Sequence, residues 1–171
     1  MTVRNAGGSF RIRRAARADV PLLLRMIREL AEYERLSDAV VAREADIEAS
    51  LFGENRCAEA AIGELGGEAI AFAVWFQNFS TFVGRRGLYL EDLYVRPQHR
   101  GRGHGLALLR WLADRALELG CGRMEWAVLD WNDPAIAFYR RLGARPLDEW
   151  TIFRLTPDAL RRFVDGEPAA D

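Results

Sequence analysis

A glycine-rich turn, Arg100–Gly105, constrains the fold most strongly, because it stands between a strand pattern and a helix pattern. The stretch 87–95 before it is rich in aromatic and aliphatic residues, which is typical of a central strand. The stretch 103–119 after it is amphipathic and is followed by Gly120, which predicts a long helix that ends there. A further strand pattern at 123–129 completes a strand–helix–strand crossover, so these two strands are expected to run parallel.

The rest of the chain predicts antiparallel strands and amphipathic helices. Gly66-Gly67 between two apolar stretches favours a hairpin turn, and Asp19 followed by Pro21 marks the start of a helix. The order of these elements predicts an α/β fold with a mixed, mostly antiparallel central sheet and helices on both faces. The expected elements are strands at 9–14, 57–65, 68–77 and 149–155, helices at 19–34, 43–51 and 133–142, and a short helix that starts at Thr156-Pro157-Asp158.

One domain is expected, because 171 residues with half of the positions apolar suffice for a single sizeable core. We place it at 9–165, with flexible ends at 1–8 and 166–171. The net charge of -1 gives no general attraction to nucleic acid or to anionic membranes. No stretch reaches the roughly 20 apolar residues of a membrane span, and the start lacks a secretory signal, so a cytoplasmic protein is expected. Cys57 and Cys121 lack the close cysteine or histidine neighbours of a metal site, so no metal is expected.

The glycine-rich turn is suited to binding an anion. At the start of a helix, backbone N–H groups are presented without obstructing side chains, and Arg100 and Arg102 add positive charge. No Gly-Lys-Ser/Thr follows, as it would in a nucleotide-hydrolase phosphate loop, and Leu106 replaces the third glycine of a dinucleotide fingerprint. A flexible turn with solvated arginines is the alternative. We interpret His99 and His104 as surface or turn residues.

Two further places combine polar groups with apolar surroundings. Glu91 and Asp92 stand side by side in the strand pattern at 87–95, where charged side chains are costly unless solvated or paired. Strand alternation sends them to opposite faces unless a bulge intervenes, and an edge strand or an arginine-paired carboxylate is the structural alternative. Asn132 and Tyr139, seven residues apart, lie on one face of a predicted helix. A helix cap and a core aromatic are the structural alternatives for them.

Together these motifs resemble the GNAT superfamily of N-acetyltransferases. The superfamily signature, Arg/Gln-x-x-Gly-x-Gly/Ala, is matched by Arg100-x-x-Gly103-x-Gly105. Within the superfamily the chain is similar to the diamine (spermidine/spermine) and thialysine acetyltransferases, from about Phe10 to Leu155. Four motifs carry that likeness: Glu29-Leu-Ala-Glu-Tyr-Glu34, Leu88-Tyr-Leu-Glu-Asp92, Ala127-Val-Leu-Asp-Trp-Asn132 and Phe138-Tyr139.

The resemblance implies an enzyme that moves acetyl from acetyl-coenzyme A (acetyl-CoA) directly onto a small-molecule primary amine, and a homodimer. The resemblance implies Tyr139 as the general acid. Glu91 is expected to act as the general base, because a lysine-like ammonium must lose a proton before it can attack. The coenzyme is expected to contact Leu93, Tyr94, Val95, Arg100, Gly101, Arg102, Gly103, His104, Gly105, Leu106, Asn132, Asp133, Pro134 and Ala135. The amine is expected to contact Tyr33, Glu34, Glu91, Asp92, Glu125, Trp126, Ala127 and Glu149.

One segment departs from the polyamine pattern. The predicted loop 78–86 has no carboxylate and carries Arg85 and Arg86, whereas a long polycation favours acidic groups along its path. The stretch 127–132 is closer to the thialysine branch. Two other functions stay open: acetylation of a peptide, protein or aminoglycoside amine, and a catalytically silent acyl-CoA-binding module.

Overall fold

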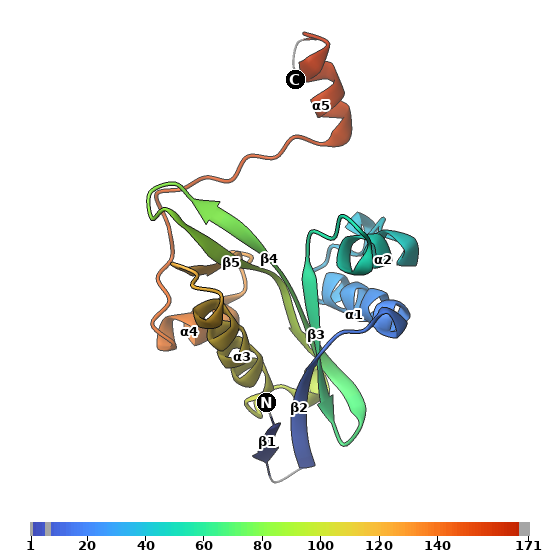
Figure 1. Cartoon of the computed structure of the whole chain (residues 1–171), viewed down its shortest axis with the longest axis vertical. Helices are drawn as coiled ribbons and strands as arrows, with labels where there is room; N and C mark the ends of the chain where they lie inside the picture. The colour runs from blue at the N-terminus through green and yellow to red at the C-terminus, as the bar shows by residue number, and fades with distance from the viewer. Residues whose placement is uncertain (1, 6–7, 168–171) are drawn as a thin grey trace. The chain divides into compact units, whose positions relative to one another are not determined.

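A mixed sheet dominates the first of the two units into which the chain divides, Met1–Leu129 and Asp130–Asp171. The computed structural model describes residues 2–5 and 8–167, and within them the sheet has six strands in the order β1-β2-β3-β4-β5-β6 (Figure 1). Every neighbouring pair is antiparallel except β5 and β6, which are parallel. The strands are β1 Thr2–Asn5, β2 Gly8–Arg14, β3 Glu59–Leu65, β4 Glu68–Ser80, β5 Arg85–Val95 and β6 Met124–Trp126.

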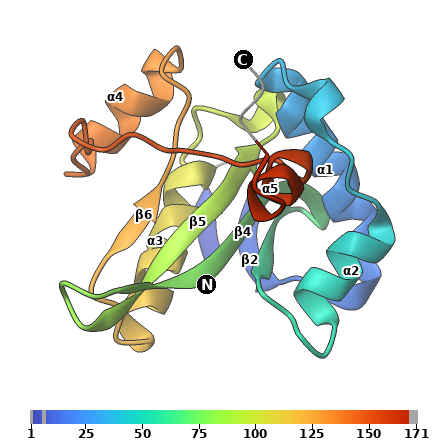
Figure 2. The same ribbon diagram turned by 90° about the horizontal axis from the view of Figure 1, so that it is seen from above.

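Helices cover both faces of this sheet, as expected. Helices α1 (Val20–Tyr33) and α2 (Glu44–Phe52) lie against one face, and α3 (His104–Glu118) lies against the other (Figures 1 and 2). The core on the first face includes Phe72 and Tyr94 from neighbouring strands. Burial of apolar surface contributes about 25 cal/mol per Å², so this core holds α1 against β4 and β5. The C-terminal end of α1 is thereby positioned relative to β5. No helix within the described residues is long and apolar enough to cross a membrane.

Three short 3₁₀ turns and two further helices complete the chain. The turns are η1 (Arg17–Asp19), η2 (Ser37–Ala39) and η3 (Pro97–His99). The second unit holds helices α4 (Asp133–Arg141) and α5 (Pro157–Val164).

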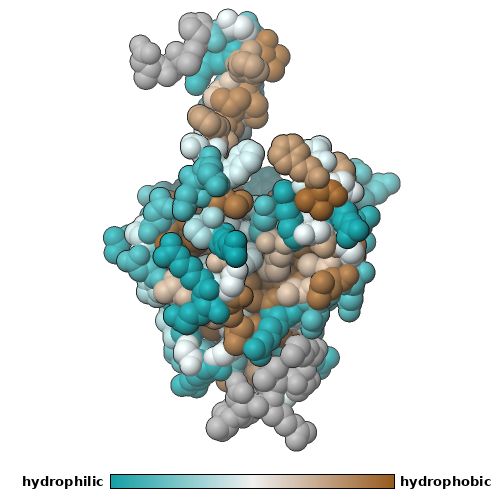
Figure 3. Space-filling model, turned by 90° about the vertical axis from the view of Figure 1, so that its left-hand side faces the viewer, coloured by the Kyte–Doolittle hydropathy of each residue, from teal (hydrophilic) through white to brown (hydrophobic). Residues whose placement is uncertain are grey.

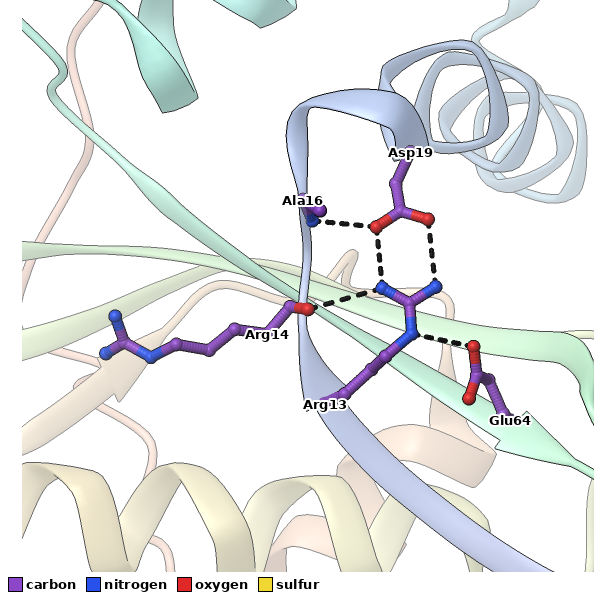
Figure 4. Close-up of polar contacts among 5 residues, drawn as sticks. All are labelled: Arg13, Arg14, Ala16, Asp19 and Glu64. Carbon is purple, nitrogen blue, oxygen red and sulfur yellow. Dashed lines mark hydrogen bonds and ion pairs between the residues drawn. The ribbon is translucent and has the colours of Figure 1, made fainter.

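A cluster of charges fastens the start of α1 to two strands (Figure 4). The Arg13 guanidinium donates to both carboxylate oxygens of Asp19 at 2.6 and 2.9 Å, and to Glu64 Oε1 at 2.7 Å. Asp19 also accepts the backbone N–H of Ala16 at 2.7 Å. Its side chain therefore caps the turn before α1 rather than α1 itself. The Arg13 hydrogen bonds hold the pKa of the Asp19 carboxyl below its ordinary value.

Most predicted elements are confirmed within a few residues, including the parallel crossover pair. Strand β1 was not predicted, and the expected loop at 78–86 is shorter because β4 extends to Ser80 and β5 begins at Arg85. The predicted strand at 149–155 is wrong: those residues are irregular. A strand needs a neighbour to take up its backbone hydrogen bonds, and the described residues of 130–167 contain no other strand. The single-domain boundaries at 9–165 stay a prediction.

Candidate active site

The glycine-rich turn forms the start of α3, immediately beside the end of β5. Gly101 and Gly103 have φ values of +73° and +84°, a left-handed conformation that side chains disfavour. Gly105 faces the strand, since a Cβ there would lie 3.8 Å from side-chain atoms of Leu93 and Val95. The amide groups of the first helical turn have no carbonyl one turn before them, so they are available to an anion. The backbone therefore fits the anion-binding role expected of 100–106.

Arg100 connects this turn to the end of α1. Its Nε donates to the Val95 carbonyl at 2.8 Å, and its guanidinium carbon lies 4.1 Å from the centre of the Tyr33 ring. The Tyr94 ring is also within cation–π range, at 5.6 Å. Arg100 thus ties the predicted coenzyme turn to Tyr33, which is predicted to contact the amine.

His104 is not a surface residue, so that interpretation was wrong. It is 3% exposed, and its ring lies 4.4 Å from the Phe10 ring of β2. Neither ring nitrogen has a hydrogen-bond partner among the described residues. Burial, followed by the charges of His99 and Arg102, lowers the pKa of His104 below 6.5, so the ring is neutral at physiological pH.

A β-bulge in β5 places the two adjacent carboxylates. Val74 of β4 pairs with Asp92, but the next residue, Trp75, pairs with Leu90, so Glu91 is the extra residue. On one side of the bulge, Asp92 shares the face of Val74, which packs on the α1 core. On the other side, Leu90 shares the face of Trp75, whose ring contacts Trp111 of α3 at 5.4 Å.

Acidic groups gather around this bulge on the α1 face. Burial raises the pKa of Asp92 to about 6, and the negative charges of Glu91 and Glu34 add to the rise. Burial also raises the pKa of Glu34. The pKa of Tyr89 is raised by burial and then by the negative charges of Glu91 and Glu125. Crowded carboxylates repel one another, and a nearby positive charge relieves that repulsion, so this cluster (Glu34, Glu91 and Asp92) favours a bound cation.

A second polar group lies beside Tyr89, at the parallel junction of β5 and β6. Tyr89 is the register partner of Glu125, which forms an ion pair of 2.8 Å with Arg123. Asn78 Nδ2 donates to the same Glu125 oxygen at 3.3 Å. Arg123 also donates to Ser80 Oγ at 3.1 Å.

The second unit carries the remaining predicted site residues. Asn132 caps α4, since its Oδ1 accepts the Ala135 N–H at 3.4 Å. Tyr139 is half-buried in α4 and its ring lies 5.5 Å from that of Phe138. Glu149 is exposed in the irregular stretch before α5.

The structure brings the predicted residues of the first unit together in two groups on adjoining parts of β5. The first is the anion-binding turn with Leu93, Tyr94 and Val95, and the second is the acidic cluster with Tyr33. Glu125 and Trp126 lie in β6, and Ala127 follows it, exposed. Sequence reasoning missed Tyr89, Asn78 and Arg123. The one hint in the sequence was the glycine at position 87. The structure explains it, because a Cβ there would collide with Asn78 Oδ1 and would lie 3.3 Å from Arg123 Cγ.

Comparisons with known proteins show the family of this chain. Residues 23–144 match the model of the Acetyltransferase (GNAT) family. The chain is 43% identical over 164 residues to thialysine N-epsilon-acetyltransferase of Sus scrofa, covering 90% of this chain and 96% of that protein. It is 30% identical over 196 residues to an L-ornithine N5-acetyltransferase of Arabidopsis thaliana, covering 88% and 86%. A solved integron cassette protein from the V. cholerae mobile metagenome superposes with a TM-score of 0.76 at 26% identity, covering 91% and 97%.

Proposed function

The chain belongs to the acetyltransferase (GNAT) family, and on that premise we propose that it moves acetyl from acetyl-CoA directly onto the primary amine of a small molecule, such as thialysine, a diamine or a polyamine. One observation carries the proposal. The bulge in β5 carries Glu91 and Asp92, which form an acidic cluster with Glu34 from the end of α1, and the predicted anion-binding turn follows the same strand within a few residues. A cationic amine and a polyanionic coenzyme thus have adjoining sites of opposite charge.

The residues around β5 suit a coenzyme with a pyrophosphate and a pantetheine arm. The first-turn amides of α3 and the flanking arginines, Arg100 and Arg102, suit the pyrophosphate. The backbone of 93–95, next to the bulge, suits the amide groups of the arm. The start of α4 at 132–135 is the proposed border of the coenzyme in the second unit. Acetyl-CoA supplies the activated thioester.

Glu91 is proposed as the general base. A lysine-like amine has a pKa near 10.4, so roughly one molecule in a few thousand is neutral at pH 7. The acidic cluster attracts the ammonium, and Glu91 accepts its proton directly or through a water. The freed lone pair can then form the new N–C bond as the C–S bond breaks.

Tyr139 is proposed as the general acid. A phenol with a pKa near 10 is protonated at neutral pH and can donate to a leaving thiolate whose conjugate acid has a pKa near 8.5. Cys57 and Cys121 fall in none of the motifs, so direct transfer is proposed over a covalent acetyl-enzyme.

The choice of amine rests on the relatives and on the hairpin between β4 and β5. Proteins similar to this chain are named for thialysine and for L-ornithine, which are amino acids. Arg85 and Arg86 on the hairpin disfavour a long polycation. A peptide or protein amine is the alternative substrate, and an acyl-CoA-binding module without turnover is the alternative function. We also propose a cytoplasmic homodimer.

The test measures thiol release from acetyl-CoA with thialysine, ornithine, lysine, putrescine, spermidine, a peptide and an aminoglycoside. We expect release with small amines and little with the peptide. Coenzyme binding without release for any amine would contradict the proposal and favour the silent module.

The Tyr139→Phe variant tests the general acid in the same assay. We expect turnover to fall about 100-fold or more, with little change in the dissociation constant of acetyl-CoA, since only the proton donor is lost. Unchanged turnover would remove Tyr139 from the mechanism.

A further inference from the structure

Glu125 is among the residues expected to contact the amine, but its ion pair with Arg123 has no role in the proton and acetyl transfer described above. The pair lies on β6 and the residue before it, opposite Tyr89 of β5. Both side chains reach solvent, with 39% of Arg123 and 25% of Glu125 exposed. A positive and a negative group thus stand side by side at the surface, 2.8 Å apart, next to the acidic cluster.

This pair is held in place from three sides. Asn78 of β4 donates to Glu125, and Ser80 of β4 accepts from Arg123. Gly87 of β5 lies beneath both, because a Cβ at that position would lie 2.3 Å from Asn78 Oδ1 and 3.3 Å from Arg123 Cγ. Such support is unusual for an exposed ion pair, since most are loosely held and contribute about 0–1 kcal/mol to stability. The arrangement orients the two charges.

The separation between this ion pair and the acidic cluster indicates how long the substrate is. Tyr89 is the register partner of Glu125 across the parallel junction of β5 and β6. Glu91 is two residues along β5 from Tyr89, which corresponds to about 7 Å at the rise of a strand. This separation matches an extended side chain of the lysine type, which carries an amine at one end and an amino-acid head at the other.

We propose that Arg123 and Glu125 bind the α-amino-acid head of the substrate: Arg123 pairs with the α-carboxylate and Glu125 with the α-ammonium, while the ω-amine lies at the acidic cluster. This specificity rests on the proposed acetyltransferase function. An arginine pairs well with a carboxylate through two parallel N–H groups. A diamine has no carboxylate, so it leaves Arg123 facing a second positive charge. The pair therefore selects amino acids over diamines of the same length.

The test compares amines that differ only in the carboxylate: ornithine with putrescine, and lysine with cadaverine. In the wild type, kcat/KM is expected to be higher for the amino acid of each pair. Arg123→Gln is expected to raise the KM of the amino acids about ten- to a hundredfold, with little change in kcat and little change for the diamines. Arg123→Glu is expected to reverse the preference.

Arg14→Gln is the matched control, because Arg14 of β2 forms a surface ion pair of similar length, 2.7 Å, with Glu59 of β3 and has no role in the proposed amine site. The melting temperature and acetyl-CoA affinity of each variant show that the fold and coenzyme site are intact. If Arg123→Gln weakens amino acids and diamines equally, or if the wild type prefers diamines, the inference is overturned while the acetyltransferase function stands. Absence of turnover with every amine would overturn both.

Discussion

The folded protein disfavours the ionised form of Asp92. Its pKa is raised to about 6 because it is buried beside Glu91 and Glu34. Because this folded pKa lies above the unfolded value of 3.8, ionisation of Asp92 lowers the free energy of unfolding as pH rises from about 4 through about 6. Asp92→Asn is therefore expected to increase the free energy of unfolding at pH 8 by about 1–3 kcal/mol, in urea denaturation. Unchanged stability would show that Asp92 is not strained by its surroundings.

The same substitution is expected to impair catalysis, because it removes charge from the amine site. In the wild type, kcat/KM for the amine should rise with pH through about 6 as Asp92 ionises. Asp92→Asn should raise the amine KM about tenfold and flatten this part of the pH profile. Asp114→Asn, on the exposed surface of α3, is the control and should leave both unchanged.

His104 predicts a loss of stability in acid. Its pKa is lowered from 6.5, chiefly by burial, so the unfolded chain binds a proton more readily than the folded one. Stability is then fully present above about 6.5 and falls as pH decreases below that value. His104→Phe, which retains an aromatic ring against Phe10, should lose less stability between pH 7 and 5.5 in thermal melts. Equal loss in both proteins would exclude His104 as the source.

Adjacent charges in an apolar strand were enough to predict Glu91 and Asp92 as site residues, because such a pair needs a physical reason. Arg123 could not be found in this way. It is one of 24 basic residues, and its orientation depends on Ser80, which accepts its hydrogen bond and lies 43 positions earlier. His104 was misjudged because glycines surround it in sequence, whereas its ring turns inward onto Phe10 from a distant strand.

At the scale of the elements, the Arg13 cluster links β2, β3 and the start of α1. Arg13→Gln removes four hydrogen bonds, three of them to the carboxylates of Asp19 and Glu64, and leaves these two side chains without their arginine partner. We expect the free energy of unfolding at pH 7 to fall by about 2–4 kcal/mol, because removal of the guanidinium leaves part-buried carboxylates without a compensating charge. Arg11→Gln, exposed in the same strand, should change it by less than about 0.5 kcal/mol. Similar losses for both variants would show that the cluster has no special role.

The periodicity of the sequence predicted most elements, because their apolar faces are buried in the usual way. The sequence could not predict whether β5 has a bulge at Glu91, because a single extra residue does not change the composition of a strand. The expected strand at 149–155 failed for another reason. Alternation of apolar residues indicates that a segment can pair, but a hydrogen-bonded neighbour decides whether it does.

At the scale of the whole molecule, the second unit exposes an apolar arm at 150–164 (Figure 3). Phe153 is 91% exposed and Phe163 is 74% exposed, and contiguous apolar surface of this kind marks interaction sites. We expect this arm to be covered in a homodimer, with a solution mass twice 19.4 kDa in sedimentation equilibrium. Phe153→Asp combined with Phe163→Asp should give a monomer. A wild-type monomer at all concentrations would contradict the dimer.

The proposed activity is direct transfer of acetyl from acetyl-CoA to an amine. The measurement that tests it most directly is mass spectrometry of both protein and amine after stoichiometric acetyl-CoA has reacted with ornithine or thialysine. We predict one acetyl group on the amine, one equivalent of free thiol and no acetyl group on the protein. Acetyl on a protein side chain, or bound coenzyme with the amine unchanged, would contradict it.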